Sequence, residues 1–413
     1  MLNRRAIIVA GMGAFFAGMA TARAADSASP NDTARFLAGM AVDPDSPLAP
    51  LTKEVSWQQH ARSFDAGFGQ FDVSQLARIR AWSVNNLTTS RPAMFYMFSG
   101  PDFLYANAFY PNAKTYVLAG LEPVGTIPDL TTLRGSLAPN LYHLHSSIYT
   151  LLSHTFFITH RMKSDLHVGR VNGTLPILYV FLARSGKSVS EVSLVRIDEQ
   201  GAVQPDDGSP GSGARGVKIL FAGSDGEPRT LYYFSTNLAN EGVKSSNFLK
   251  FLESLGRGDS LIKSASYLLH SDGFSKVRDF LIANSAAMVQ DDSGIPLRYC
   301  DPKKWDLLPF GRYLGPIDVF PGRYQPAYTV LFRNSRPIDF GIGYRWRPNE
   351  SNLLLAIRKP ESAPEALVEP TSERERAEMT QTVETNRNST VRPRRAGYPQ
   401  TFRWPLDWLR LSR

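Results

Sequence analysis

The chain has a single cysteine, Cys300, among its 413 residues. No intramolecular disulfide can form, and we interpret Cys300 as a small buried hydrophobic residue. The sequence also contains no P-loop, no G-x-S-x-G and no H-E-x-x-H. These absences argue against P-loop phosphate binding, against serine hydrolases of the usual α/β type and against a zincin-type metal site.

The charge of the chain is mildly basic and has no concentrated basic stripe. The formal net charge is +8, and loss of a leader that carries Arg4, Arg5 and Arg23 would lower it by three. A small positive excess spread along the chain argues against a nucleic-acid partner.

The first 24 residues have the three parts of a secretory signal peptide. Asn3-Arg4-Arg5 is basic, Ile7–Ala20 is an apolar run of 14 residues, and Ala22-Arg23-Ala24 is a small-x-small cleavage site. The run is too short to span a bilayer, and no later stretch is apolar enough to do so. We expect a periplasmic or secreted bacterial protein without a transmembrane segment after cleavage. An uncleaved anchor and twin-arginine export are the alternatives.

Beyond the signal peptide at 1–24, composition divides the chain into three parts. We expect a loose N-terminal leader over 25–54, one globular body over 55–358, and a disordered tail over 359–413. The tail is first acidic and then basic, with seven Glu between 361 and 384 and seven Arg between 387 and 413. Its aromatic, arginine-rich end has the composition of a segment that docks on a partner or on the body itself.

The stretch from Met94 to Glu122 predicts the centre of the fold. Met94–Phe98 and Thr115–Leu121 are apolar runs typical of buried strands. Between them, Ser99–Asp102 combines a capping hydroxyl, a proline and an acid, which together predict a helix start. Two buried strands joined by a helix indicate a parallel pair inside a larger sheet.

The rest of the body predicts further strands and helices. Hairpins are expected from 175–184 with 189–197 and from 217–222 with 230–235; helices over 246–255, 260–269 and 274–284; and strands over 328–333, 340–346 and 353–358. The fold class expected is therefore α/β in the mixed α+β sense: a central mixed parallel/antiparallel sheet with flanking helices.

The histidine-rich segment 137–162 does not predict a metal site. His143 and His145 would share one face of a strand, but the neighbouring leucines follow helical spacing, which places the two rings about 200° apart. No carboxylate stands at ligand spacing. We assign no metal ligands, and the residues point to no particular cofactor.

Catalytic candidates come from carboxylates at predicted strand ends. Asp291 and Asp292 follow a short apolar strand, a usual position for site residues in α/β proteins. A hydrolase-like site would use one of them as general base or metal ligand, with Asp102 at another strand end, His270 as proton shuttle and Arg298 holding an anion. The alternatives are structural: Asp-Asp-Ser-Gly is good turn chemistry, and His270 precedes residues that cap the next helix.

Ligand-binding candidates come from a loop over 305–324 that is rich in arginine and aromatic residues. Arg312-Tyr313 recurs as Arg323-Tyr324, a combination that suits sugars, anionic groups or a protein partner. The alternative is a loop pinned to the body by its aromatic residues. We favour a non-catalytic protein that binds a small molecule or an envelope partner through this loop or the tail, over a hydrolase-like enzyme.

The signal-peptide assignment predicts the mature N-terminus. We expect cleavage after Ala24, so that intact-mass and N-terminal peptide measurements on the exported protein find Ala25 as the first residue. An exported protein that retains Met1 would instead establish an uncleaved anchor.

Overall fold

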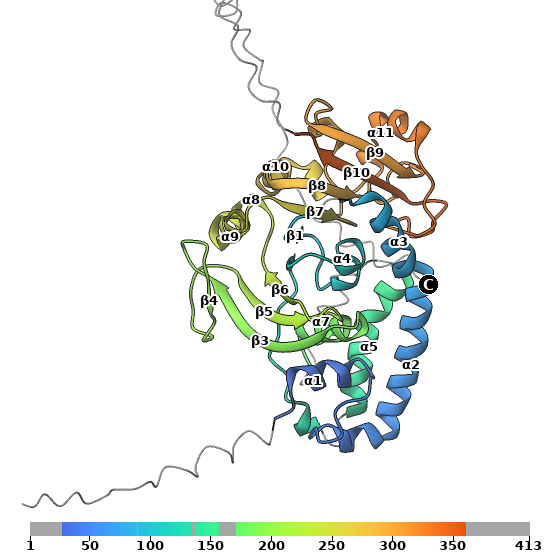
Figure 1. The fold of residues 1–413 in the computed structure, drawn as a ribbon. Coiled ribbons are helices and arrows are strands. Elements are labelled where there is room, and N and C mark those ends of the chain that lie inside the picture. The colour runs from blue at the N-terminus through green and yellow to red at the C-terminus, as the bar shows by residue number, and fades with distance from the viewer. Residues whose placement is uncertain (1–26, 89, 134–136, 155, 157–170, 361–413) are drawn as a thin grey trace, which may run out of the picture.

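The computed structural model describes residues 27–360 apart from 89, 134–136, 155 and 157–170 (Figure 1). The predicted signal peptide and the predicted tail from residue 361 onward lie outside the described residues. Within the described ranges, no helix is both long enough and apolar enough to cross a membrane.

Ten strands in the described residues form one mixed sheet, in the order β4-β3-β5-β6-β2-β1-β7-β8-β10-β9. The five central strands β6, β2, β1, β7 and β8 are parallel, and antiparallel strands extend both edges. The strands are β1 Ala93–Tyr96, β2 Thr115–Gly120, β3 Ser188–Ile197, β4 Val203–Pro205, β5 Arg215–Ala222, β6 Pro228–Ser235, β7 Gly258–Ile262, β8 Ser285–Gln290, β9 Trp305–Gly311 and β10 Asn352–Arg358. The predicted mixed sheet is confirmed.

The predicted strand–helix–strand unit is also confirmed. β1 and β2 pair in parallel, and helix α4 (Phe103–Phe109) connects them. Side chains of β1 and β2 alternate between two hydrophobic cores, so both faces of the strands are buried. This explains why both strands appear in the sequence as continuous apolar runs.

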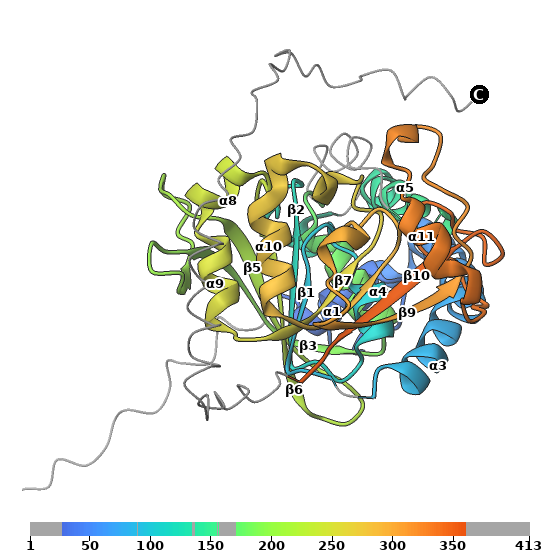
Figure 2. The same ribbon diagram turned by 90° about the horizontal axis from the view of Figure 1, so that it is seen from above.

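Helices cover both faces of the sheet (Figure 2). The core on one face includes side chains of α1, α2, α3, α4, α5 and α7, and the core on the other includes side chains of α8, α9 and α10. The helices are α1 Pro30–Leu37, α2 Val55–Phe71, α3 Ala77–Asn86, α5 Leu137–His154 and α7 Leu175–Arg184, then α8 Asn240–Ser246, α9 Phe248–Ser254, α10 Ser275–Asn284 and α11 Pro326–Leu331.

The structure differs from the expected loose leader over 25–54. Residues 30–37 form helix α1, and 49–53 form a short 3₁₀ helix. Phe36 and Leu37 are 0% exposed and belong to the core that also contains Met94 of β1 and Tyr116 of β2. Their burial contributes hydrophobic free energy, so the body begins near residue 30 rather than at 55.

Several predicted strands and helices are wrong. Residues 175–184 form helix α7 rather than a strand, and the predicted helix over 260–269 begins inside strand β7. A helix buried on every side has no polar face, so its sequence looks like that of a buried strand. The predicted strand over 328–333 overlaps helix α11, and the predicted strand over 340–346 contains only an isolated bridge between Ile342 and Arg345. The neighbour of β10 at the edge of the sheet is β9.

The connections after β1 and β7 leave the sheet on opposite faces. These strands are neighbours and parallel, yet β1 leads into α4 on one face and β7 leads into α10 on the other. Such a divergence opens a crevice at the carboxyl ends of the two strands, which is the usual binding position in open α/β sheets.

The burial of α1 predicts that the N-terminal segment stabilises the body. Phe36→Ala should lower the free energy of unfolding by about 3–5 kcal/mol, because it removes a fully buried aromatic side chain. Urea denaturation measures this. The control Val55→Ala, at a side chain 66% exposed, should change it by less than about 0.5 kcal/mol. A Phe36→Ala effect as small as the control would show that α1 does not support the core.

Candidate functional site

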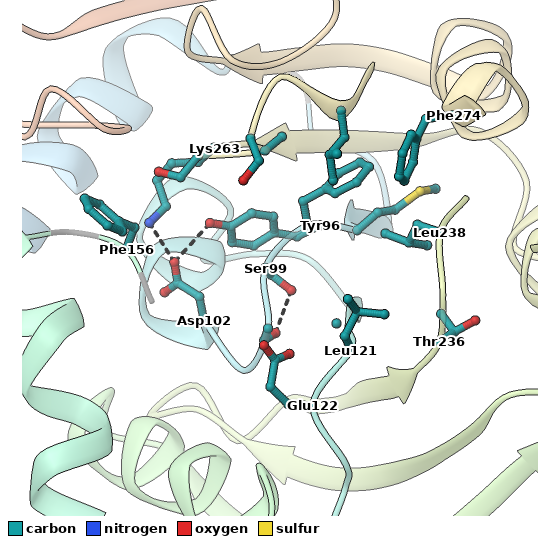
Figure 3. A pocket seen from close by; sticks show the side chains of 18 of the residues that line it. Tyr96, Ser99, Asp102, Leu121, Glu122, Phe156, Thr236, Leu238, Lys263 and Phe274 are labelled. Atoms are coloured by element: carbon teal, nitrogen blue, oxygen red, sulfur yellow. Dashed lines mark hydrogen bonds and ion pairs between the residues drawn. The ribbon is translucent and has the colours of Figure 1, made fainter. Parts of the chain in front are cut away.

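A cavity of about 380 Å³ lies at the carboxyl ends of β1, β2, β6 and β7 (Figure 3). Its walls are mostly the segments that directly follow these strands: 97–100 after β1, 121–122 after β2, 236–239 after β6 and 263–266 after β7. The cavity therefore occupies the crevice that the topology predicts.

The walls of the cavity are mainly apolar with a few polar side chains among them. The apolar residues include Met97, Phe98, Leu121, Phe156, Leu238, Leu268 and Phe274. The charged residues are Asp102, Glu122 and Lys263, and all three are buried. An apolar concavity with a small number of fixed polar groups is the usual composition of a small-molecule site.

The charged centre of the wall is an ion pair between Asp102 and Lys263. Lys263 Nζ lies 2.9 Å from Asp102 Oδ2, and the two side chains are 1% and 2% exposed. Tyr96 donates its hydroxyl to the same oxygen at 3.0 Å, and the other carboxylate oxygen accepts the Tyr105 N–H that starts α4. Figure 3 shows Tyr96 and Lys263 converging on Asp102.

The surroundings of Lys263 favour the neutral form of its amino group. Burial lowers the pKa of Lys263, and the negative charges of Asp102 and Asp291 oppose that effect. The ammonium also lies 3.8 Å from the centre of the Tyr105 ring, a cation–π contact. The pair is thus a fixed, solvent-excluded polar element beside the cavity.

The turn after β7 has an unusual backbone. Ser264, Ser266 and Tyr267 have φ angles of 52°, 51° and 53°. They are three of only four non-glycine residues with positive φ in the part of the chain that the structure describes. Such conformations cost free energy and concentrate at functional sites, where surrounding contacts hold them.

Asp291 supports this turn from outside the cavity. It accepts the Ser264 N–H at 3.1 Å through Oδ2 and the Ser293 N–H at 3.1 Å through Oδ1. Tyr344 also fixes the turn, since its hydroxyl donates to the Ser264 carbonyl at 2.8 Å. Burial, and then the charge of Asp292, raise the pKa of Asp291 to about 7.

Asp292 is likewise a buried anchor. Its carboxylate accepts the Tyr267 hydroxyl at 2.7 Å and the Asn352 amide at 2.9 Å. Burial raises the pKa of Asp292. Of the four predicted catalytic residues, only Asp102 lines the cavity, whereas Asp291 and Asp292 hold the turn that carries Lys263.

His270 and Arg298 do not line the cavity. The His270 ring packs 5.3 Å from the Tyr267 ring, centre to centre, and burial followed by the charges of Arg323 and Arg298 lowers its pKa to about 4. Arg298 is exposed and lies over the Tyr299 ring. The structure therefore does not bring this histidine and this arginine to Asp102 and Lys263.

The predicted arginine and aromatic site is a separate surface. Arg312, Tyr313, Arg323 and Tyr324 are also absent from the cavity wall. Tyr313 stacks on Tyr324 with ring centres 6.0 Å apart and accepts the Gln325 N–H at 3.0 Å. These contacts match the pinned-loop alternative, and binding by this loop stays a prediction.

Sequence reasoning missed Lys263 and Glu122. Lys263 falls within the wrongly predicted helix over 260–269, which concealed its position at the end of β7. Glu122 directly follows the correctly predicted strand β2, so its position at a strand end was the available signal.

The letters G-x-G-x-x-G occur at 211–216, but that segment leads into strand β5 and opens no helix, so it forms no dinucleotide-binding turn.

Within the described residues, no group of three His, Cys, Asp or Glu side chains could hold a metal ion. The chain has an α/β fold with a cavity at the topological switch point of its sheet. Comparison with known proteins finds no family model, no curated protein and no solved structure that matches the chain significantly.

The raised pKa of Asp291 predicts a pH dependence of stability. A carboxyl with a pKa of about 7 in the folded chain and about 4 in the unfolded chain favours folding most at low pH, and this contribution is lost as the pH rises through about 7. Between about pH 5 and about pH 8, the free energy of unfolding should therefore fall more for the wild type than for Asp291→Asn.

Urea denaturation of both proteins at the two pH values measures the difference. Asp279→Asn, at a side chain 68% exposed, is the matched control. Its free energy of unfolding should fall between the two pH values by as much as that of the wild type. An equal fall in the free energy of unfolding for Asp291→Asn and the wild type would contradict a raised pKa of Asp291 in the folded state.

Proposed function

We propose that this chain is an exported protein that binds a small organic molecule in the cavity at the carboxyl ends of β1, β2, β6 and β7. The observation that carries this proposal is the position and composition of the cavity. It lies at the point where the sheet topology diverges, and it combines apolar walls with a buried ion pair.

The two kinds of wall have different parts in binding. Figure 3 shows Asp102 and Lys263 on one side of the cavity, with Phe274 and Leu238 on the other. Apolar surface buried by a ligand supplies most of the free energy, at roughly 25 cal/mol per Å². The polar side fixes the orientation of the ligand, because its groups are already held in place before binding.

A hydrolase-like enzyme is the second candidate function. Its support is the strained turn beside a buried lysine whose pKa is lowered, a combination found at catalytic sites. Such an enzyme would use Asp102 and Lys263 as its proton-transferring pair. Binding needs fewer assumptions, since the cavity alone supports it.

Export would be consistent with a binding role, although it does not identify the ligand. The N-terminal pattern of a signal peptide favours the periplasm or the exterior of a bacterium. A small-molecule carrier or receptor there would bind its ligand directly from the surroundings of the cell.

Occupation of the cavity is testable with an uncharged fluorescent probe. N-phenyl-1-naphthylamine, which fluoresces more strongly in apolar surroundings, should bind the wild type and show a saturable increase. Leu121→Trp should weaken this binding at least about tenfold, because Leu121 lines the cavity and a larger side chain there would fill its mouth.

Leu121 is 51% exposed, so the larger side chain should not disturb the core. The matched control is Val330→Trp, at a residue 61% exposed in α11 and absent from the cavity wall. A wild type without saturable binding, or equal weakening by both variants, would refute the proposal.

A further inference from the structure

Among the residues that the structure describes, one charge in the cavity wall has no counter-charge. Glu122 lines the cavity and is 2% exposed. Among the residues that the structure describes, it forms no ion pair; the contact of its carboxylate is with the Tyr233 hydroxyl, 3.4 Å from Oε2. A buried carboxylate without a cation is costly, so its retention at a cavity wall points to a charge supplied from outside.

The carboxylate of Glu122 is held in its position. The Tyr233 hydroxyl also donates to the backbone carbonyl of Glu122 at 2.8 Å, which ties the end of β2 to β6. A Cβ atom at Gly120 would lie 2.3 Å from Oε2, so the carboxylate occupies space that only glycine leaves free. Figure 3 shows the carboxylate pointing toward the Ser99 segment, with Leu121 beside it.

The positive charge in the same wall does not balance Glu122. The ammonium of Lys263 is already paired with the carboxylate of Asp102, 2.9 Å away. The three charged residues that line the cavity in the described part of the chain, Asp102, Glu122 and Lys263, thus sum to one negative charge. An excess of this sign in an apolar cavity favours a cationic ligand over a neutral or anionic one.

Two further polar atoms of the lining residues have no partner in the described part of the chain. They are Thr236 Oγ1 and Ser264 Oγ, both buried without a hydrogen bond. Buried polar atoms are normally satisfied, and an unsatisfied one is costly. A ligand that carries N–H groups would offer partners to the hydroxyls as well as to the carboxylate.

We propose that the ligand of this cavity is an organic cation: a primary or secondary amine attached to an apolar body. Its ammonium group pairs with Glu122, and its body packs against Phe98, Leu238 and Phe274. This inference rests on the proposed function, since it names the ligand class of the same cavity.

Displacement of bound N-phenyl-1-naphthylamine by three small probes of similar shape tests the inference. The probes are 2-phenylethylamine, 2-phenylethanol and phenylacetate, which are cationic, neutral and anionic at neutral pH. The amine should displace the fluorescent probe at a concentration roughly tenfold or more below that of the alcohol, because a hydrogen-bonded charge pair adds affinity. Phenylacetate should be the weakest competitor.

The Glu122→Gln variant tests the residue itself. It keeps the shape of the side chain and should remove the preference for the amine over the alcohol, whereas Glu253→Gln, at an exposed residue of α9, should retain it. If Glu122→Gln fails to fold, the ranking of the three probes on the wild type still decides whether the cavity prefers a cationic ligand.

The possible failures are distinguishable. A wild type that binds N-phenyl-1-naphthylamine but ranks the alcohol or the acid at least equal to the amine overturns the cationic ligand and leaves the binding function standing. A preference for the amine that survives in folded Glu122→Gln also overturns the assignment to Glu122. A wild type that does not bind the fluorescent probe overturns the proposed function and this inference together.

Discussion

The buried ion pair between Asp102 and Lys263 is the interaction on which the candidate site depends. Removing two charges from water costs several kcal/mol for each, and only good geometry with further hydrogen bonds offsets that cost. Here Asp102 accepts the Tyr96 hydroxyl and caps helix α4, while Lys263 ends strand β7. The pair therefore requires β1, β7 and α4 in their observed register. It joins the two connections that diverge to opposite faces of the sheet.

A second set of contacts makes this geometry possible. The turn after β7 contains three residues in the left-handed region, at roughly 1–3 kcal/mol each. Asp291 and Ser293, at the end of β8, accept backbone N–H groups of this turn, and Tyr344 closes it from the other side. Asp291 and Asp292, two of the carboxylates that sequence reasoning selected for catalysis, thus act one layer behind the cavity. Their raised pKa values follow from burial.

The fold was predictable from sequence where the signals are local. The β1–α4–β2 unit has apolar runs for the strands and the turn Ser99–Asp102 for the helix start, and each of these signals lies within a few residues of the element that it specifies. Helix α7 was not predictable in this way, because a helix surrounded by core has the same apolar pattern as a buried strand. The burial of the N-terminal helix α1 was not predicted, because it depends on a core formed by distant segments.

For the site, the sequence by itself determined little more than one residue. It placed Asp102 at a strand end beside a helix start, because capping chemistry is local. From the single cysteine it also excluded an intramolecular disulfide, and from the composition of the termini it predicted a signal peptide and a disordered tail. Only the tertiary structure decided that Lys263 and Glu122 share a cavity with Asp102 and that His270 does not. The physical reason is that strand order is set by pairing between distant segments, which no local pattern encodes.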